Sequence, residues 1–308
     1  MVVVSLPDRS WIDDVGAVTG VEIVQWDGQT PPPRPDIEVF VAPYLQGARP
    51  VQRAVEQAPG LRLVQLLTAG FDGVFAVVPD RIAIANAGPV HDDSTAELAL
   101  TLALAALRGI PQAVRAGEQG RWLDLSGRPS LADRRCLVIG YGGVGSGIAR
   151  RLLAFGAGVT AVASRPRTGD DVVPAVQGID DVPGLLPDAE VVFLALPLTD
   201  ETRGLVGEAF LARMPPGALL VNVARGPVVD TAAVLRHIGR LRFALDVTDP
   251  EPLPPEHPLW SAPEVLVSPH VGGATTAFRP RAITLLRDQL ARLAAGAPGT
   301  HLVRTPVL

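Results

Sequence analysis

The sequence predicts an α/β fold in which two doubly wound parallel sheets form two domains. Short apolar segments rich in β-branched residues alternate with helical segments along the chain, a pattern typical of parallel sheets that are covered on both faces. The chain has 308 residues, of which 47% are hydrophobic, and this is enough apolar material for two cores of ordinary size. Eleven strand segments are expected, which is too many for one doubly wound sheet at this spacing.

The expected strands fall into two groups. The first group lies at residues 2–4, 21–26, 37–41, 61–67 and 82–85, and the second lies at residues 136–139, 159–163, 191–196, 219–223, 243–246 and 265–267. Each segment is short and almost continuously apolar, as expected for a strand that is buried on both faces of a sheet.

Two long helical segments lie where the two groups meet. One is expected from about 94 to 116, with Asp93 or Ser94 as its N-cap. The other is expected from about 281 to 295, where apolar residues recur at helical spacing. If both helices cross between the domains, the first domain is discontinuous. The expected domains are then residues 1–97 completed by 277–308, and residues 98–276.

Charge and composition exclude several partners and locations. The net charge of -5 gives no general attraction for nucleic acid or for an anionic membrane. The longest apolar run, residues 98–107, is far shorter than the roughly 20 residues that span a bilayer. The first residues lack the basic segment of a secretory signal, and the single cysteine, Cys136, allows no disulfide within the chain. We therefore expect a cytoplasmic protein.

The absence of lysine from the sequence limits its chemistry. A Schiff base between a lysine and pyridoxal phosphate is excluded, and so is a P-loop, whose motif requires a lysine. Any role that needs a fixed cation must be filled by arginine, whose planar guanidinium suits carboxylates and phosphates.

A glycine-rich motif predicts a dinucleotide site. It has the form GxGxxG, lies between an apolar strand and an amphipathic helix, and comprises Gly140, Tyr141, Gly142, Gly143, Val144 and Gly145. In this context the first glycine permits a tight turn, the second lets the backbone approach a pyrophosphate, and the third lets helix and strand pack closely. The N–H groups and dipole of the following helix then favour phosphate. The alternative is a glycine-rich turn without a ligand.

The end of the next strand favours NADP(H), with NAD(H) remaining possible. An NAD site usually has an acidic residue there, which binds the ribose 2′-OH. Here the strand is followed by Ser164, Arg165 and Arg167, and the first acidic residue is Asp170. Two arginines and a serine would bind a 2′-phosphate through charge-assisted hydrogen bonds. The alternative is a solvated surface loop in an arginine-rich protein.

Three later strands are followed by polar residues that suit hydride transfer to a 2-oxo acid. Arg225 can hold a carboxylate and polarise a carbonyl. His270 can act as general acid near neutral pH. Glu251 is the expected carboxylate partner that fixes the imidazole tautomer. Asp246 is the alternative partner, and we also count it among the cofactor-binding residues.

Other chemistries find no support in the sequence. No metal site is expected, because there is no HExxH motif, no pair of cysteines and no histidine cluster at ligand spacing. A hydrolase with a Ser/His/Asp triad lacks its GxSxG motif.

Several motifs in order resemble the D-isomer-specific 2-hydroxyacid dehydrogenases. They are VIGYGGVGSGIARRL, LPLTDETRGLV, VNVARGPVVD, ALDVTDPEPLPPEHPLW and SPHVGGAT, within residues 86–276, with a looser match at LLTAGFDGV and IANAGPVHDDSTAE in the first domain. The resemblance implies a Rossmann cofactor domain at 98–276 and a flavodoxin-like substrate domain. It also implies a catalytic triad of Arg225, Glu251 and His270, a substrate carboxylate held by the N–H groups of Ala69 and Gly70, and a homodimer.

The expected function is NADP(H)-preferring reduction of a small 2-oxo acid, or oxidation of the D-2-hydroxy acid. Glyoxylate, hydroxypyruvate or a larger 2-oxo acid is the expected substrate, because the ASRPR segment after the second cofactor strand is similar to that of the NADPH-linked glyoxylate and hydroxypyruvate reductases. Two alternatives remain open at this point: oxidation of an unusual small anion such as phosphite, and a dinucleotide-sensing regulatory protein of the same fold.

Overall fold

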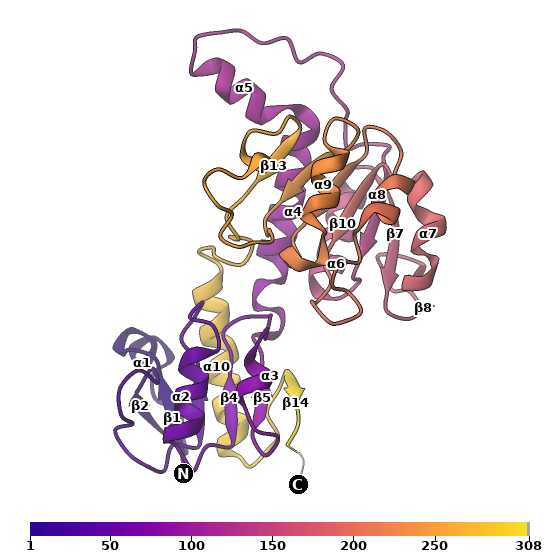
Figure 1. Ribbon diagram of the computed structural model, residues 1–308. Helices are drawn as coiled ribbons and strands as arrows, with labels where there is room; N and C mark the ends of the chain where they lie inside the picture. The colour runs from indigo at the N-terminus through magenta and orange to yellow at the C-terminus, as the bar shows by residue number, and fades with distance from the viewer. Residues whose placement is uncertain (307–308) are drawn as a thin grey trace. The chain divides into compact units, whose positions relative to one another are not determined.

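The computed structural model describes residues 1–306 and divides the chain into two compact units (Figure 1). Unit 1 comprises Met1–His91 and Thr276–Leu308, and unit 2 comprises Asp92–Thr275. The sequence placed these boundaries at 97/98 and 276/277, so the first boundary lies six residues earlier in the structure than expected. The reason is that helix α4 (Asp92–Arg108) packs along its length against elements of unit 2.

The sheet of unit 1 has the strand order β14-β5-β4-β3-β1-β2. Neighbouring strands are parallel, except that β14 is antiparallel to β5. The bounds are β1 (Val2–Leu6), β2 (Val21–Gln25), β3 (Val39–Val41), β4 (Leu63–Gln65), β5 (Ala83–Ala85) and β14 (Leu302–Arg304). The carboxyl ends of the five parallel strands therefore share one edge of the sheet, where a ligand is expected in an open α/β fold.

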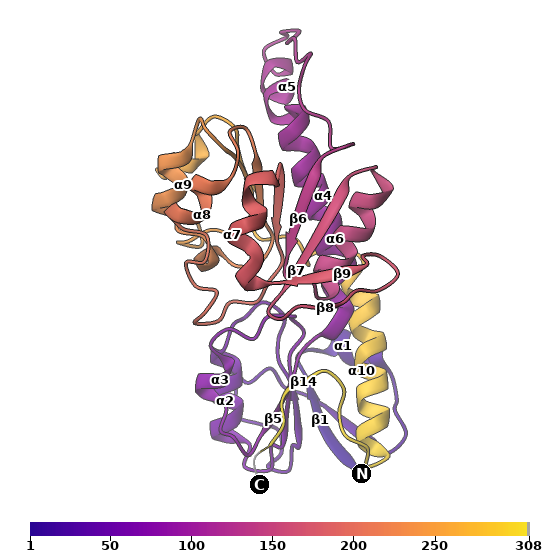
Figure 2. The ribbon, with the colours of Figure 1, turned by 90° about the vertical axis from the view of Figure 1, so that its right-hand side faces the viewer.

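Helices cover both faces of this sheet (Figure 2). They are α1 (Arg9–Val15), α2 (Arg49–Gln57), α3 (Val74–Val77) and α10 (Phe278–Ala294), with a short 3-10 helix η1 (Gly88–His91). Successive strand residues point to opposite faces, so Val4 packs with the α1 and α10 side while Val3 packs with the α2 and α3 side. Both faces are buried, which explains the continuous apolar strands.

The sheet of unit 2 has the strand order β13-β12-β11-β10-β6-β7-β9-β8. Only the edge strand β8 is antiparallel to its neighbour. The bounds are β6 (Arg135–Ile139), β7 (Gly158–Ala163), β8 (Arg167–Thr168), β9 (Ala175–Gly178), β10 (Val191–Leu194), β11 (Leu219–Asn222), β12 (Arg242–Leu245) and β13 (Val265–Val267).

The helices of unit 2 also lie on both faces of its sheet (Figure 2). One side carries α4 and α6 (Gly143–Ala154), which pack on Val138 and Phe193, and the other side carries helices that pack on Leu137 and Leu194. The remaining helices are α5 (Ile110–Gly117), α7 (Val182–Leu185), α8 (Glu208–Arg213), α9 (Thr231–His237), η2 (Ile179–Asp181), η3 (Leu186–Asp188), η4 (Gly226–Val228) and η5 (Pro258–Trp260). The predicted fold class, two doubly wound parallel-sheet domains, is confirmed.

Three details differ from the sequence prediction. The expected helix over 94–116 is two helices, because Gly109 adopts a left-handed conformation with φ of 68° between α4 and α5. Helix α4 begins at Asp92, directly after η1, so neither Asp93 nor Ser94 is its N-cap. The edge strands β8 and β14 and the short strand β9 next to β8 were not predicted, because segments of two to four residues have no clear periodicity.

Membrane-spanning length was also assessed for residues 1–306. No single helix there is both long and apolar enough to cross a bilayer. Residues 88–108 and 110–117 meet the requirement only when taken together, and the two segments are bent by 66° at their junction.

Candidate active site

Three polar loops of unit 2 follow strands that lie side by side. Strands β11, β12 and β13 are parallel neighbours, with Asn222 opposite Leu245 and Leu245 opposite Val267. The loops that leave their carboxyl ends therefore start at the same edge of the sheet. These loops carry Arg225 and His270 together with the acidic residues after β12, so the sheet topology gathers the predicted catalytic residues of unit 2.

Asn222 shapes the loop that carries Arg225. Its side chain is fully buried, accepts a hydrogen bond from the Ala224 N–H (3.0 Å) and donates one to the Arg225 carbonyl (3.1 Å). The Arg225 guanidinium donates to the Ala224 carbonyl (2.7 Å) and is partly buried. A buried amide that is satisfied on both sides fixes the backbone here, and the arginine side chain is thereby held at the strand end.

Asp246 organises the loop that carries His270. Its carboxylate is only 3% exposed and accepts hydrogen bonds from the Ser268 hydroxyl (2.8 Å), the Val271 N–H (3.0 Å) and the Gly272 N–H (3.0 Å). Its carbonyl accepts the His270 N–H (2.8 Å). These contacts hold His270 at a φ of 53°, in a left-handed region that few residues other than glycine occupy.

The role of Asp246 therefore differs from the alternative considered in the sequence analysis. The imidazole partner is Glu251, whose Oε1 lies 2.5 Å from His270 Nδ1. An ionised carboxylate can only accept a hydrogen bond, so Nδ1 carries the proton and Nε2 is the nitrogen left for proton transfer. Both side chains are 41% exposed, which leaves the imidazole accessible to a substrate.

Three other histidines have structural partners. His91 is buried and lies 2.9 Å from the Leu67 carbonyl. His237 contacts Glu208 at 2.8 Å and accepts from Arg240 at 3.1 Å. His257 accepts the Leu259 N–H at the start of η5. Since each ring nitrogen in these contacts already serves the fold, His270 is the better candidate for acid–base chemistry.

The glycine-rich loop fits a dinucleotide. Gly140 has a φ of 101°, and a Cβ on Gly145 would lie 2.0 Å from the Gly140 carbonyl oxygen, so both positions require glycine for the fold itself. A Cβ on Gly142, in contrast, would meet no atom within 4 Å. The open space at Gly142 leaves room for the close approach of a pyrophosphate to the backbone.

The first turn of helix α6 supplies donors beside this loop. Its N-cap is Gly142, which makes no side-chain capping hydrogen bond. The first N–H groups of a helix have no partner within the helix and attract anions together with the helix dipole. The residues present therefore fit the pyrophosphate of a nicotinamide dinucleotide.

The segment after β7 presents the predicted phosphate-binding residues. Ser164, Arg165 and Arg167 are all exposed. Arg167 also donates a hydrogen bond from Nη2 to the Tyr141 carbonyl at 2.7 Å, and Tyr141 in turn donates its hydroxyl to Asp170. These contacts were not predicted from the sequence, because they join residues 26 and 29 positions apart.

In unit 1, the loop after β4 presents two unused backbone donors. The carbonyls of residues 68–70 accept hydrogen bonds from the Ala87 N–H, the Asn86 side chain (2.8 Å) and the Thr68 hydroxyl (2.7 Å). No described residue of unit 1 accepts a hydrogen bond from the N–H groups of Ala69 or Gly70. Two adjacent donors of this kind suit an anion. Asn86, at the end of β5, was not singled out from the sequence.

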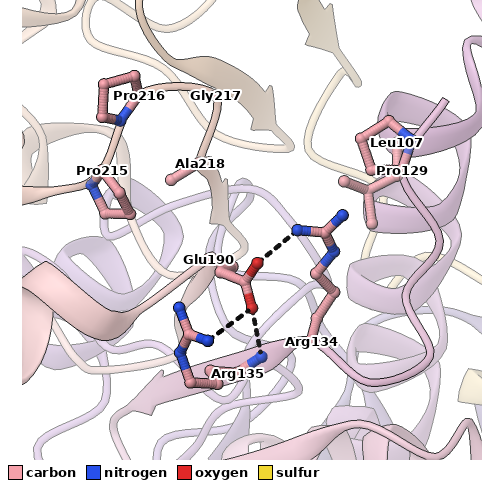
Figure 3. Close-up of a pocket in the computed structure, with 9 residues that line it drawn as sticks. All are labelled: Leu107, Pro129, Arg134, Arg135, Glu190, Pro215, Pro216, Gly217 and Ala218. Atoms are coloured by element: carbon pink, nitrogen blue, oxygen red, sulfur yellow. Dashed lines mark hydrogen bonds and ion pairs between the residues drawn. The ribbon is translucent and has the colours of Figure 1, made fainter. Parts of the chain in front are cut away.

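A cavity of about 150 Å³ lies at the opposite edge of the unit 2 sheet (Figure 3). It is found where β6, β10 and β11 begin, away from the glycine-rich loop. Glu190 contacts the Arg134 guanidinium, the Arg135 N–H (3.1 Å) and the Arg135 guanidinium (3.6 Å). These contacts join the starts of two strands, so we assign the cluster a structural role.

Cys136 is a buried thiol near the start of β6 in the unit 2 sheet. Burial, with a smaller contribution from nearby Glu190, raises the pKa of the Cys136 thiol to about 12, so it is not a thiolate near neutral pH. Among residues 1–306, no group of three or more His, Cys, Asp or Glu side chains could hold a metal ion.

Comparison with known proteins identifies the family. A sequence model described as "D-isomer specific 2-hydroxyacid dehydrogenase, NAD binding domain" matches residues 100–272. A glyoxylate reductase of Aeropyrum pernix is 32% identical over 307 residues, covering 93% of this chain and 91% of that protein.

Two solved structures extend the match to the whole chain. A D-isomer specific 2-hydroxyacid dehydrogenase from Xanthobacter autotrophicus Py2, in complex with NADPH and MES, has a TM-score of 0.82 and 30% identity, covering 98% of this chain and 97% of that one. An NADPH-dependent glyoxylate/hydroxypyruvate reductase from Sinorhizobium meliloti, in complex with NADP and sulfate, has a TM-score of 0.80 and 26% identity, with the same coverage. The chain belongs to the D-isomer-specific 2-hydroxyacid dehydrogenase family.

Proposed function

We propose that this enzyme is a cytoplasmic, NADPH-preferring reductase of small 2-oxo acids such as glyoxylate or hydroxypyruvate. The observation that carries the proposal is the 2.5 Å contact between His270 Nδ1 and Glu251. Glu251 lies on the loop after β12, next to the loop after β11 that carries Arg225. An acid oriented by a carboxylate, with an arginine from the neighbouring strand end, suits the reduction of a carbonyl beside a carboxylate.

Each residue of the proposed site has its own role in reduction of the carbonyl. A bound nicotinamide supplies the hydride that reduces the carbonyl carbon. His270 donates the proton from Nε2 to the carbonyl oxygen, while Glu251 holds Nδ1 and balances the charge of the imidazolium. Arg225 binds the substrate carboxylate and polarises the carbonyl. In unit 1, the N–H groups of Ala69 and Gly70 are proposed donors to a carboxylate, as the family resemblance implies.

The product of the reaction tests this function. With hydroxypyruvate and NADPH, the enzyme should form glycerate of the D configuration in one-to-one ratio with the NADPH consumed. Chiral chromatography of the product and the absorbance of NADPH measure both quantities. Formation of the L isomer, or consumption of NADPH without glycerate, would count against the proposal.

The cofactor preference is proposed from the segment after β7. Ser164, Arg165 and Arg167 offer hydroxyl and guanidinium donors to a 2′-phosphate. The motif residues Gly140, Gly142, Gly143, Val144 and Gly145 would hold the pyrophosphate together with the start of α6. The Asp246 carboxylate supports the His270 loop through its hydrogen bonds with Ser268, Val271 and Gly272, so its proposed place beside the cofactor is secondary.

Arg165→Asp should separate the two cofactors. Charge-assisted hydrogen bonds contribute about 1.5–3 kcal/mol, so the Kd of NADPH should rise by about 10- to 100-fold. The Kd of NADH should change much less, because NADH has no 2′-phosphate. Arg213→Asp makes the same charge change on the exposed surface of α8 and serves as the control. If Arg165→Asp raised the Kd of NADPH and of NADH equally, Arg165 would not be assigned to the 2′-phosphate.

A homodimer is part of the same proposal. Four apolar side chains in the segment that extends from unit 2 at α5 are exposed, namely Ile110, Val114, Trp122 and Leu123, and Trp122 is 100% exposed. Exposed apolar groups clustered in one segment are typical of an interface between subunits.

Trp122→Asp should therefore shift the enzyme from dimer towards monomer, because a carboxylate opposes burial of this surface. Sedimentation velocity at several protein concentrations measures the change. Trp260→Asp, at another exposed tryptophan of unit 2, is the control. A wild-type protein that sediments as a monomer at every concentration would contradict the dimer.

A further inference from the structure

We propose that Tyr141 is a specificity-determining residue for NADP(H), because its hydroxyl holds the Asp170 carboxylate and its backbone carbonyl anchors Arg167. The inference rests on the proposed site for the adenosine ribose beside the end of β7. Tyr141 lies inside the glycine-rich loop, while Asp170 and Arg167 lie in the hairpin that contains β8 and β9. One residue thus contacts two of the charged side chains near the proposed 2′-phosphate site, Asp170 through its hydroxyl and Arg167 through its backbone carbonyl.

Three donors hold the exposed Asp170 carboxylate, chiefly through Oδ1. It accepts the Tyr141 hydroxyl at 2.9 and 3.1 Å on its two oxygens, and the N–H groups of Val172 and Val173 at 2.9 and 3.1 Å. The two backbone N–H groups are the main cause of a lowered Asp170 pKa, so the carboxylate is charged. Burial, followed by the bond to Asp170, raises the pKa of Tyr141 to about 12, so the phenol stays a donor.

This arrangement matters because of where Asp170 lies. It is the first acidic residue after β7, although it lies beyond β8 and not at the strand end, where an NAD site usually has its acid. A carboxylate released from this hairpin would be a negative charge in this segment that can repel a 2′-phosphate. The carboxylate is bonded to Tyr141 and to the turn over residues 170–173, and these bonds hold it away from the ribose 2′ position. The phenol therefore removes a feature that would favour NAD(H).

Arg167 is held by the same residue. Its Nη2 donates to the Tyr141 carbonyl at 2.7 Å, and its guanidinium carbon lies 5.9 Å from the centre of the Tyr141 ring. A guanidinium has five N–H donors, so anchoring through one nitrogen leaves others for a phosphate. A side chain already held in place loses less conformational freedom when it binds.

Tyr141→Phe tests the role of the hydroxyl alone, since it keeps the ring and the backbone carbonyl. We expect the Kd of NADP⁺ to rise about fivefold, because the released carboxylate would face the 2′-phosphate. The Kd of NAD⁺ should stay constant or fall. Isothermal titration calorimetry gives both constants without turnover, and the melting temperature of the free enzyme checks its folding.

A second substitution completes a double-mutant cycle. Asp170→Asn alone should change the ratio of the two Kd values by less than about twofold, because the wild-type carboxylate is already held. In the Tyr141→Phe background, the same change should restore the wild-type ratio. Asp171→Asn, at the neighbouring exposed acid, is the matched control and should restore nothing.

Several results would overturn the inference. An unchanged ratio of the two Kd values in Tyr141→Phe, or an equal rise in the Kd of both cofactors, would reduce Tyr141 to a structural residue. If Tyr141→Phe does not fold, a change above threefold in Asp170→Asn alone would show that the carboxylate already acts on the cofactor, which contradicts the inference. A wild-type preference for NADH would contradict the proposed function instead, because the cycle measures only changes relative to wild type.

Discussion

His270→Asn should lower kcat for 2-oxo acid reduction by about 10²-fold or more, the usual contribution of a general acid. Asparagine suits this test because it tolerates the left-handed backbone better than most residues do, and His270 has a φ of 53°. Its amide can still donate to Glu251, yet it cannot deliver a proton. The loss therefore reports the acid itself and not a rearranged loop.

The His270 variant needs two further measurements. Its Kd for NADPH should remain close to wild type, because the proposed pyrophosphate site lies at the glycine-rich loop and not at the His270 loop. His257→Ala removes a histidine that accepts a backbone N–H in η5 and should retain most activity. If His270→Asn kept near-normal kcat, His270 would not be the acid, and the contact with Glu251 would be structural.

Arg225→Lys should lower kcat/KM by about 10²-fold, although the charge is kept. An ammonium cannot bind a carboxylate through two parallel N–H bonds as a guanidinium does. The Arg225 guanidinium also donates to the Ala224 carbonyl. A lysine ammonium has fewer donors, so it could not hold this carbonyl and bind the substrate carboxylate in the same geometry.

Steady-state kinetics with varied 2-oxo acid measure this effect. Arg203→Lys, on the exposed surface of unit 2, should leave kcat/KM nearly unchanged. Rescue is not expected from higher substrate concentration alone, because Arg225 is proposed to polarise the carbonyl as well as to bind the carboxylate. A defect confined to KM would limit Arg225 to binding.

The strands and the grouping of catalytic candidates were accessible from the sequence because both follow local rules. Continuous apolar runs predicted every strand except β8, β9 and β14, and strands of a parallel sheet end at one edge. Arg225 and His270 could therefore be placed at the same edge of the sheet from the sequence alone. The glycine-rich motif was recognisable because its strand and helix flank it directly.

The remaining features depend on contacts that no local pattern encodes. Tyr141 reaches Asp170 across 29 positions, and the intervening hairpin pairs strands of two and four residues. Asp246 was considered as a partner for the imidazole, but its carboxylate is directed to Ser268 and two backbone N–H groups. Side-chain direction at a loop depends on the whole hydrogen-bond network, and this explains why the sequence left the choice open.

The most direct test of the central claim is the initial rate of NADPH and of NADH oxidation with glyoxylate, hydroxypyruvate, pyruvate and phenylpyruvate. The proposed function predicts rapid turnover of at least one acid, with a higher kcat/KM for NADPH than for NADH. Binding of NADPH without turnover of any of the four acids would contradict the reductase function.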